Sequence, residues 1–175
     1  MLSNFCFWFA ALVALGASLL AVSRRNAVHG LLWLVLSLLA IAVLFFMLGA
    51  PFSAALEVIV YAGAIMVLFL FVVMMLHLGP AAQGQEAQWL TPGVWIAPGL
   101  LALGLAADLI AIARMAGDAP AGACVIPPEA VGTALFGPYI IGVELASVLL
   151  LAGVVAAHHL GQRQRPPLGE GAGSG

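Results

Sequence analysis

Three acidic residues interrupt long apolar stretches of the sequence: Glu57, Asp108 and Glu144. A charged side chain at the centre of a bilayer costs about 2.5–3.5 kcal/mol on insertion scales, so each of these residues needs a physical reason to be there. One reason is a position close enough to the membrane surface for water to reach the carboxyl group. The other is proton handling, in which the carboxyl group holds and releases a proton. No Lys or Arg occurs inside these stretches, which favours proton handling over buried ion pairs.

The stretch from Glu57 to Leu78 carries the strongest functional signal. It reads EVIVYAGAIMVLFLFVVMMLHL, and it is long enough to cross a bilayer as a helix because about 20 apolar residues suffice. Glu57 and Tyr61 are four residues apart and therefore share one helix face. The run Ala62–Gly63–Ala64 weakens the local helical preference. We therefore consider a π-bulge beside Tyr61 and Gly63, which would form a hinge at a functional site.

Several other residues have side chains that could do chemistry, but structural roles explain them better. Gly142 and Ala146 are four residues apart, as at close helix contacts. Four histidines fall near predicted helix ends, where a histidine is usually interfacial: His29, His77, His158 and His159. Adjacent residues such as His158 and His159 point to different sides of a helix, and no cysteine or carboxylate stands at ligand spacing. We therefore expect no metal site.

The elements that position these residues are predicted to be transmembrane helices. Of the 175 residues, 65% are hydrophobic and 7% are charged, whereas soluble domains carry about a quarter charged residues. The sequence predicts an all-α polytopic membrane protein with five helices, at about residues 4–22, 28–49, 54–78, 92–114 and 138–160. Five arginines and no lysine give no basic patch for nucleic acid. The first helix lacks a preceding basic region, so we expect it to be retained rather than cleaved.

Turn and breaker residues set the predicted helix boundaries. Ser53 is a plausible N-cap of the third helix, and Pro138 is a favoured first-turn residue of the fifth. Pro98 is expected to bend the fourth helix. The segments between the helices are predicted loops, the longest at residues 116–137, and residues 161–175 are predicted to form a disordered cytoplasmic tail.

The arginines predict the orientation of the chain. With the N-terminus outside and the C-terminus inside, four of the five arginines lie on the cytoplasmic side, and only Arg114 lies outside. Cys6 and Cys124 then both fall on the outer side. The favoured interpretation is two unpaired thiols, and a disulfide, which requires an oxidising compartment, stays open.

Three segments resemble a known family. They read VHGLLWLVLSLLAIAVLFFMLGA in the second helix, EVIVYAGAIMVLFLFVVMML in the third and VGTALFGPYIIGVELASVLLLAG leading through the fifth, joined by QWLTPGVWI before the fourth. The chain is similar to the J subunits of bacterial NADH:quinone oxidoreductase, the respiratory complex I, whose mitochondrial counterpart is the sixth NADH dehydrogenase chain. The first helix, the long outer loop and the tail carry little of this resemblance.

The resemblance implies a five-helix membrane-arm subunit in the bacterial inner membrane that binds no redox cofactor. FMN, iron–sulfur clusters and quinone belong to the rest of the implied complex, and the implied partners are its other membrane-arm subunits and the lipid bilayer. In the family, a π-bulge near the positions of Tyr61 and Gly63 is thought to switch to α-helix and gate a water path. Glu57 and Glu144 match acidic positions of the family, whereas Asp108 matches none. The implied function is coupling of quinone reduction to proton translocation.

Two other functions stay open at this stage. The third-helix motif also suits a membrane subunit of a multi-subunit cation/proton antiporter without redox chemistry, although the segment GPYIIGVELAS favours complex I. A passive scaffold that holds neighbouring helices together is the other alternative. A free-standing transporter is disfavoured because no internal inverted repeat is apparent.

Overall fold

The protein is described from a computed structural model that covers residues 2–24, 27–76, 92–115 and 125–162. Every regular element in these ranges is helical, which confirms the all-α fold class. Five helices of the described chain are long and apolar enough to cross a membrane: Ser3–Ser23, Ala27–Met47, Pro51–Met75, Trp95–Arg114 and Ile140–Gly161. The predictions for His77, Cys124, the loop at 81–91 and the tail beyond residue 162 lie outside the described residues.

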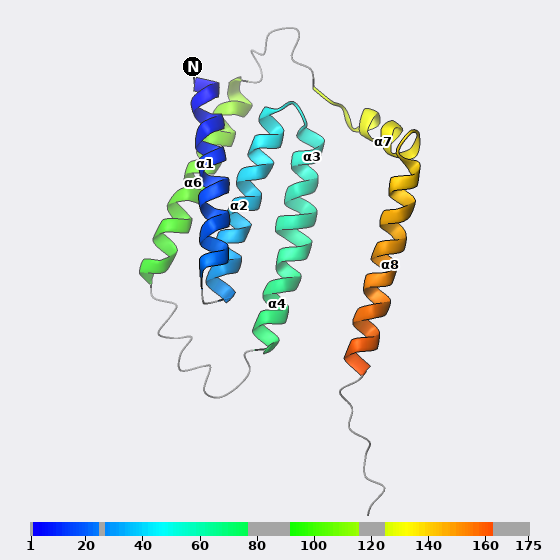
Figure 1. The fold of residues 1–175 in the computed structure, drawn as a ribbon. Coiled ribbons are helices and arrows are strands. Elements are labelled where there is room, and N and C mark those ends of the chain that lie inside the picture. Colours follow the sequence, from blue (N-terminus) through cyan, green and yellow to red (C-terminus); the bar gives the residue numbers. More distant parts are fainter. Residues whose placement is uncertain (1, 25–26, 77–91, 116–124, 163–175) are drawn as a thin grey trace, which may run out of the picture. The chain divides into compact units, whose positions relative to one another are not determined.

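The chain forms two compact units, Met1–Pro127 and Pro128–Gly175. In the first unit, α2 (Ala27–Met47) is the central helix and contacts α1 (Leu2–Ser23), the third span and α6 (Pro92–Met115) (Figure 1). The core of the unit lies mainly between α1 and α2, with one residue from α6: Ala10, Val13, Ala14, Ala17, Trp33, Leu36, Ala40, Val43 and Leu105.

Small residues and two serines hold α1 against α2. Ala10 and Ala40 are completely buried, and small side chains at such positions let helix backbones approach closely. The hydroxyl oxygens of Ser18 and Ser37 lie 2.8 Å apart, and both hydroxyl groups also lie within hydrogen-bond distance of the Ala14 carbonyl oxygen, at 2.8 and 2.9 Å. Because each hydroxyl has one proton, two of these three contacts are donated at any moment. The pair of helices α1 and α2, called the α1–α2 hairpin below, therefore combines close packing with an internal polar contact.

A glycine turn connects α2 to the third span. Gly49 has a φ of 82°, in the left-handed region that favours glycine, and the Ala50 N–H donates to the Phe45 carbonyl at 3.0 Å. The third span then begins at Pro51, with Ala50 at the N-cap position and no side-chain cap. The predicted N-cap at Ser53 is therefore wrong, because proline at the first helical position starts the helix without a capping side chain.

The fourth span, α6, continues through Pro98, which lies inside the helix. It approaches α1 closely, because a Cβ on Gly104 would lie 3.1 Å from the Phe9 ring. Beyond residue 124, the Ile126 N–H donates to the Gly49 carbonyl at 2.8 Å, which ties this segment to the turn after α2. The same end of the first unit therefore holds both the glycine turn and the segment that leads to the second unit.

The second unit contains α7 (Pro128–Phe136) and α8 (Ile140–Gln162), joined by a turn. The prediction of a loop over 116–137 is wrong for its last part, where α7 lies. Pro138 belongs to the turn rather than to the fifth span, because the Tyr139 N–H donates to the Ala134 carbonyl at 3.1 Å. A Cβ on Gly137 would lie 2.7 Å from the Thr133 carbonyl oxygen, so this turn requires glycine. The first two residues of the predicted tail are helical, since α8 ends at Gln162.

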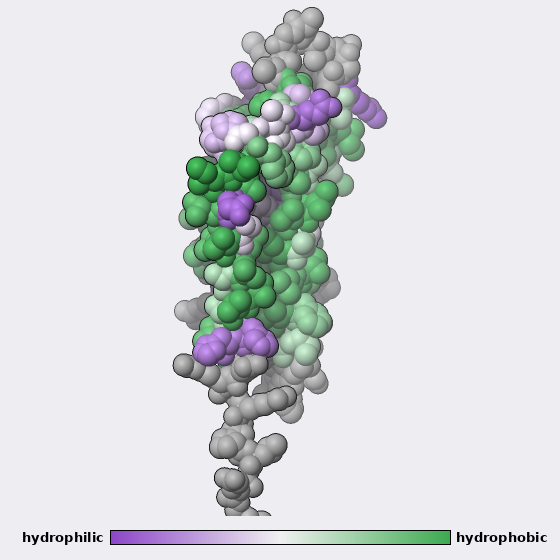
Figure 2. Space-filling model, turned by 90° about the vertical axis from the view of Figure 1, so that its right-hand side faces the viewer, coloured by the Kyte–Doolittle hydropathy of each residue, from purple (hydrophilic) through white to green (hydrophobic). Residues whose placement is uncertain are grey.

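The surface of the spans suits a membrane. Figure 2 shows hydrophobic residues in a broad green band, with hydrophilic residues gathered mainly above and below it. Taken by itself, the second unit buries none of the apolar window of α8, and the first unit leaves most of the third span exposed. Such apolar faces are typical of helices that are covered by lipid or by other helices.

Candidate functional site

The third span changes its helical geometry near its middle. It consists of α3 (Pro51–Leu56), the π-helix η1 (Glu57–Ile65) and α4 (Met66–Leu76), which form one continuous rod (Figure 1). At the start of η1, the Glu57 N–H still donates to the carbonyls of Ser53 and Ala54. At its end, the Met66 N–H donates to Gly63 and to Tyr61, five residues back. The backbone is therefore wider between these two points than an α-helix.

The π-bulge considered at Ala62–Gly63–Ala64 is confirmed, because these residues lie within η1. The segment is longer than expected from that small-residue run. It spans nine residues and begins at Glu57, so that the acid, Tyr61 and Gly63 all lie on the same irregular element. Most π-helical segments are single-turn bulges and occur frequently at functional sites.

Gly63 suits the widened backbone. A Cβ at this position would lie 3.1 Å from the Val58 carbonyl oxygen, five residues earlier in the chain. This distance is shorter than ordinary van der Waals contact, so a side chain would push against the backbone of the preceding turn. Glycine therefore relieves a close contact inside η1 and also lowers the cost of leaving the α-helical conformation.

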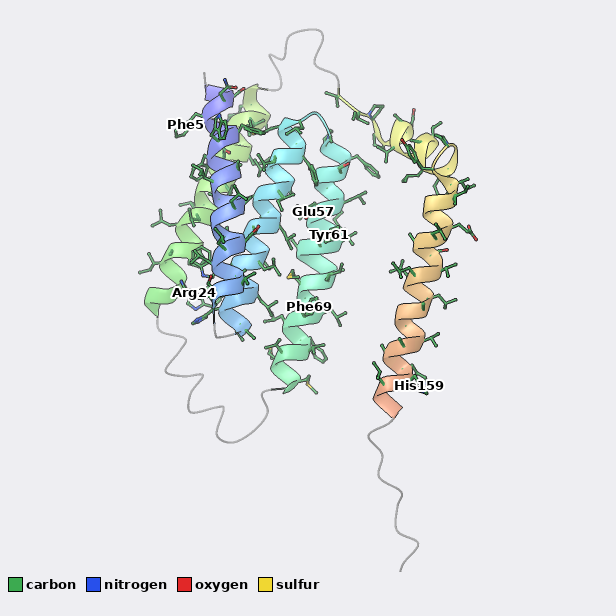
Figure 3. All side chains as sticks on the ribbon, viewed as in Figure 1. Phe5, Arg24, Glu57, Tyr61, Phe69 and His159 are labelled. Atoms are coloured by element: carbon green, nitrogen blue, oxygen red, sulfur yellow. The ribbon has the colours of Figure 1, made fainter. Side chains whose placement is uncertain are left out.

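The carboxyl group of Glu57 and the phenol of Tyr61 have different surroundings. Glu57 is 9% exposed and is the buried residue of η1, whereas Tyr61 is 51% exposed. Since η1 packs mainly on α2, the burial of Glu57 places its side chain toward the inside of the first unit. Figure 3 shows Glu57 and Tyr61 near one another in the upper half of the third span, well above Phe69. The site therefore offers one buried acid and, one turn later, one accessible hydroxyl group.

An apolar cavity of about 430 Å³ borders this site. Its walls come from α2, from the third span and from α6, and they include Val43, Val58 and Leu105. Val58 belongs to η1 and carries the carbonyl group that a Cβ on Gly63 would meet. The start of the π-helix therefore has free volume beside Val58.

Asp108 is buried as well, at 9% exposure, on α6. The thiol of Cys6 on α1 lies close enough to interact with this carboxyl group, whose Oδ2 atom has no hydrogen-bond partner among the described residues. Within the first unit, the described residues therefore shield the Asp108 carboxyl group from water. Cys6 is a free, buried thiol.

Glu144 lies in the second unit. It is an exposed residue of α8, and the Ser147 hydroxyl donates to its backbone carbonyl at 2.8 Å. The structure therefore brings together Glu57, Tyr61 and Gly63 on η1 and leaves Glu144 on a separate element. Across the described residues, no group of three or more His, Cys, Asp or Glu is placed to hold a metal ion.

Sequence reasoning missed two polar contacts of the first unit. The Ser18–Ser37 pair could have been found because each serine is a solitary hydroxyl in the middle of an apolar helix. Cys6 and Asp108 lie near the same end of the antiparallel helices α1 and α6, but no signal in the sequence shows that these two helices pair. Neither pair lies on the π-helix.

Comparisons with known proteins agree on one family. The family described as NADH-ubiquinone/plastoquinone oxidoreductase chain 6 matches residues 17–160. NADH-quinone oxidoreductase subunit J of Pseudomonas aeruginosa is 57% identical over 161 residues, which cover 91% of this chain and 97% of that protein. The subunit J of Escherichia coli K12 is 50% identical over 162 residues, which cover 93% of this chain and 88% of that protein. The subunit J of Rhodobacter capsulatus is 39% identical over 171 residues, covering 92% and 82%.

Proposed function

Because the chain belongs to the NADH-ubiquinone/plastoquinone oxidoreductase chain 6 family, we propose that it couples quinone reduction to proton translocation in NADH-quinone oxidoreductase. It is a multi-pass membrane subunit of that enzyme complex, and its own contribution is movement of a helix rather than electron transfer. FMN, iron–sulfur clusters and quinone are held by other subunits. Its partners are the neighbouring membrane-arm subunits and the lipid of the bacterial inner membrane.

The orientation that suits this role places the N-terminus outside and the C-terminus in the cytoplasm. It is supported by the arginines, because Arg24 and three others fall on the cytoplasmic side and Arg114 alone falls outside. Glu57 then lies in the outer half of the membrane, about 9 Å along the helix from Pro51 at a rise of 1.5 Å per residue.

The moving part is the π-helix η1. In the π state its amide groups bond five residues back, as Met66 does to Tyr61, and in an α-helix they would bond four residues back. Each residue of π excess that is removed turns the following helix by about 100° about its axis. A switch of η1 therefore rotates α4 (Met66–Leu76) relative to α3 (Pro51–Leu56) without unfolding either one.

The apolar cavity beside Val58 favours such a rotation. Closely packed interiors resist movement because shifted side chains meet their neighbours at once. Here, about 430 Å³ of free volume lies between α2, α3, α6 and the start of η1, so Val58 has room to shift when η1 changes its geometry. Filling or opening this apolar space changes whether water passes along the third span.

The acidic groups supply the protonatable positions. Glu57 begins η1 and is buried, so a change of η1 alters the surroundings of its carboxyl group directly. Tyr61 presents an accessible hydroxyl group one turn later, where it can bind water or a neighbouring subunit. Glu144 of α8 serves a second position along the path. Quinone reduction elsewhere in the complex biases the two states of η1, which makes the third span a bistable element.

The observation that carries this proposal is the nine-residue π-helix that begins at the buried Glu57. The test is the substitution Gly63→Val in the assembled membrane complex, with NADH-driven quinone reduction and proton pumping measured separately. A β-branched side chain at this position meets the Val58 carbonyl and restricts the backbone, so we expect a loss of pumping and turnover while assembly persists.

The matched control is Gly16→Val in α1, where a Cβ meets nothing within 4 Å and the helix is regular. This variant should keep both activities. If Gly63→Val keeps both activities in an intact complex, the third span is a scaffold rather than a gate. Absence of flavin and iron–sulfur absorbance from the purified assembly would instead favour the antiporter alternative.

A further inference from the structure

A second groove lies at the opposite end of the first unit from the glycine turn, between the α1–α2 hairpin and α4. It has a volume of about 330 Å³ and is mostly apolar, with walls that include Leu31, Leu34 and Val73. Gly30 forms part of its floor, where a Cβ would lie 3.0 Å from the Ala21 carbonyl oxygen and α1 and α2 are in contact. The volume falls within the range of about 300–1,000 Å³ that is usual for small-molecule sites.

The described cation at the mouth of this groove is Arg24. Arg24 follows the last residue of α1, is exposed, and holds its guanidinium group 6.0 Å from the centre of the Trp33 ring (Figure 3). The Trp33 ring is buried, so this contact fixes the position of the arginine against the hairpin. Arg24 is exposed, and among the described residues no carboxylate forms an ion pair with it, so an anion can approach its guanidinium group.

The polarity of the groove changes along the membrane normal. Arg24 lies between the ends of two spans, Ser3–Ser23 and Ala27–Met47, and therefore at the membrane boundary. At a rise of 1.5 Å per residue, Leu34 lies about 10 Å deeper in the membrane than Ala27, the first residue of the second span. Ser18 lies about 9 Å deeper than Arg24 along the first span. The hydrocarbon core is about 30 Å thick, so the groove reaches well into one leaflet.

We propose that this groove binds an anionic phospholipid, whose phosphate pairs with Arg24 and whose acyl chain lies between α1, α2 and α4. A charged head at the boundary joined to an apolar tail within the leaflet is the chemistry that this surface complements. A water-soluble anion would leave the apolar part of the groove empty, and an uncharged helix would leave the arginine unpaired. Basic pockets between transmembrane helices are a known setting for acidic lipid headgroups. The proposal does not depend on the gating role of η1.

The test uses the purified complex in an uncharged detergent after removal of bound lipid. A phosphatidylglycerol with a photoactivatable diazirine in its acyl chain is added, and crosslinked peptides are located by mass spectrometry. We expect label on the peptides that contain Ala21, Leu31 or Val73. A phosphatidylcholine with the same tail should label them about fivefold less at limiting lipid, the difference expected for one basic residue near an anionic headgroup.

Substitutions at two positions, Arg24 and Val22, separate the headgroup contact from the acyl-chain contact. Arg24→Gln should lower labelling by phosphatidylglycerol about fivefold, whereas Arg24→Lys should restore most of it, because each substitution changes only the headgroup contact. Val22→Trp adds bulk at the groove from a side chain that is 90% exposed, and it should block the tail while Arg24 is kept. Arg114→Gln, the same charge change on α6, should have no effect and serves as the control.

Three results would overturn the proposal. Equal labelling by phosphatidylglycerol and phosphatidylcholine in the unsubstituted complex excludes a role for the anionic head. Displacement of the lipid by millimolar inorganic phosphate indicates a site for free anions. Absence of label from these peptides in the unsubstituted complex shows that a partner subunit covers the groove. The lipid comparison uses the native sequence, so it decides the matter even if Arg24→Gln fails to assemble.

Discussion

The α1–α2 hairpin and the π-helix η1 lie in the same unit but are held in place by different means. In the hairpin, buried alanines bring two backbones together, and Ser18 and Ser37 add a polar contact between them. In η1, Glu57 is the buried residue of a nine-residue segment, and an apolar cavity lies alongside. The hairpin has the contacts of a rigid support, while η1 has the free volume and backbone geometry of a moving part. The two regions therefore divide stability and function between them.

The largest effect should follow from overpacking the hairpin. Ala40 is completely buried in the α1–α2 core, and Ala40→Phe inserts a ring where the helices touch, at a cost of about 1–3 kcal/mol or more. We expect the free energy of unfolding of the full-length chain in mixed detergent micelles to fall by this amount. Unfolding is followed by the loss of helical circular dichroism as the fraction of denaturing detergent rises.

The matched change in η1 is Ala64→Phe, at an exposed position of the π-helix. Because its side chain enters no packed interior, we expect a change within about 0.5 kcal/mol. Equal destabilisation by the two substitutions would remove the distinction between a rigid hairpin and a loosely packed η1.

The next effect concerns activity rather than stability. Glu57→Gln keeps the shape of the buried side chain at the start of η1 but removes its proton-transfer ability. Groups that transfer protons contribute about 10²–10⁴-fold, so we expect proton pumping in the assembled complex to fall by about two orders of magnitude. Native gel electrophoresis should show unchanged assembly. Pumping is measured in sealed vesicles with a pH-sensitive dye.

Glu129→Gln is the control for this substitution, since Glu129 is an exposed acid in the first turn of α7 and lies outside the spans. It should leave pumping unchanged. If Glu57→Gln retains more than half of the pumping activity, the buried carboxyl group has a structural role only. The assignment of function to η1, in contrast to the α1–α2 hairpin, would then be wrong.

The same two regions explain what could be predicted from the sequence. Long apolar runs separated by Gly, Pro and Arg predicted five spans, because crossing a bilayer imposes a length and a composition on each helix. The small residues beside Tyr61 pointed to an irregular helix, and η1 lies there. The extension of η1 back to Glu57 was not predictable, because residue type does not determine which carbonyl oxygen accepts the hydrogen bond from each backbone N–H.

Short and tertiary features were harder to predict. The nine-residue α7 was assigned to a loop because Pro and Gly flank it, and it is too short for a periodic pattern to stand out. The Cys6–Asp108 contact depends on the pairing of α1 with α6, which hydropathy does not determine. Ser53 was chosen as a cap by residue type alone, whereas the chain begins the helix two residues earlier at Pro51.

The smallest effect should come from the polar contact within the hairpin. Ser37 is 1% exposed, and its hydroxyl group lies near both Ser18 and the Ala14 carbonyl oxygen. Hydrogen bonds between membrane helices contribute about 0.6 kcal/mol on average, so Ser37→Ala should lower the unfolding free energy by about this amount, far less than Ala40→Phe. A double-mutant cycle with Ser18→Ala should give a coupling of similar size, because either hydroxyl can still donate to Ala14 when the other is removed. A loss as large as that of Ala40→Phe would mean that the serines, rather than the buried alanines, hold the hairpin together.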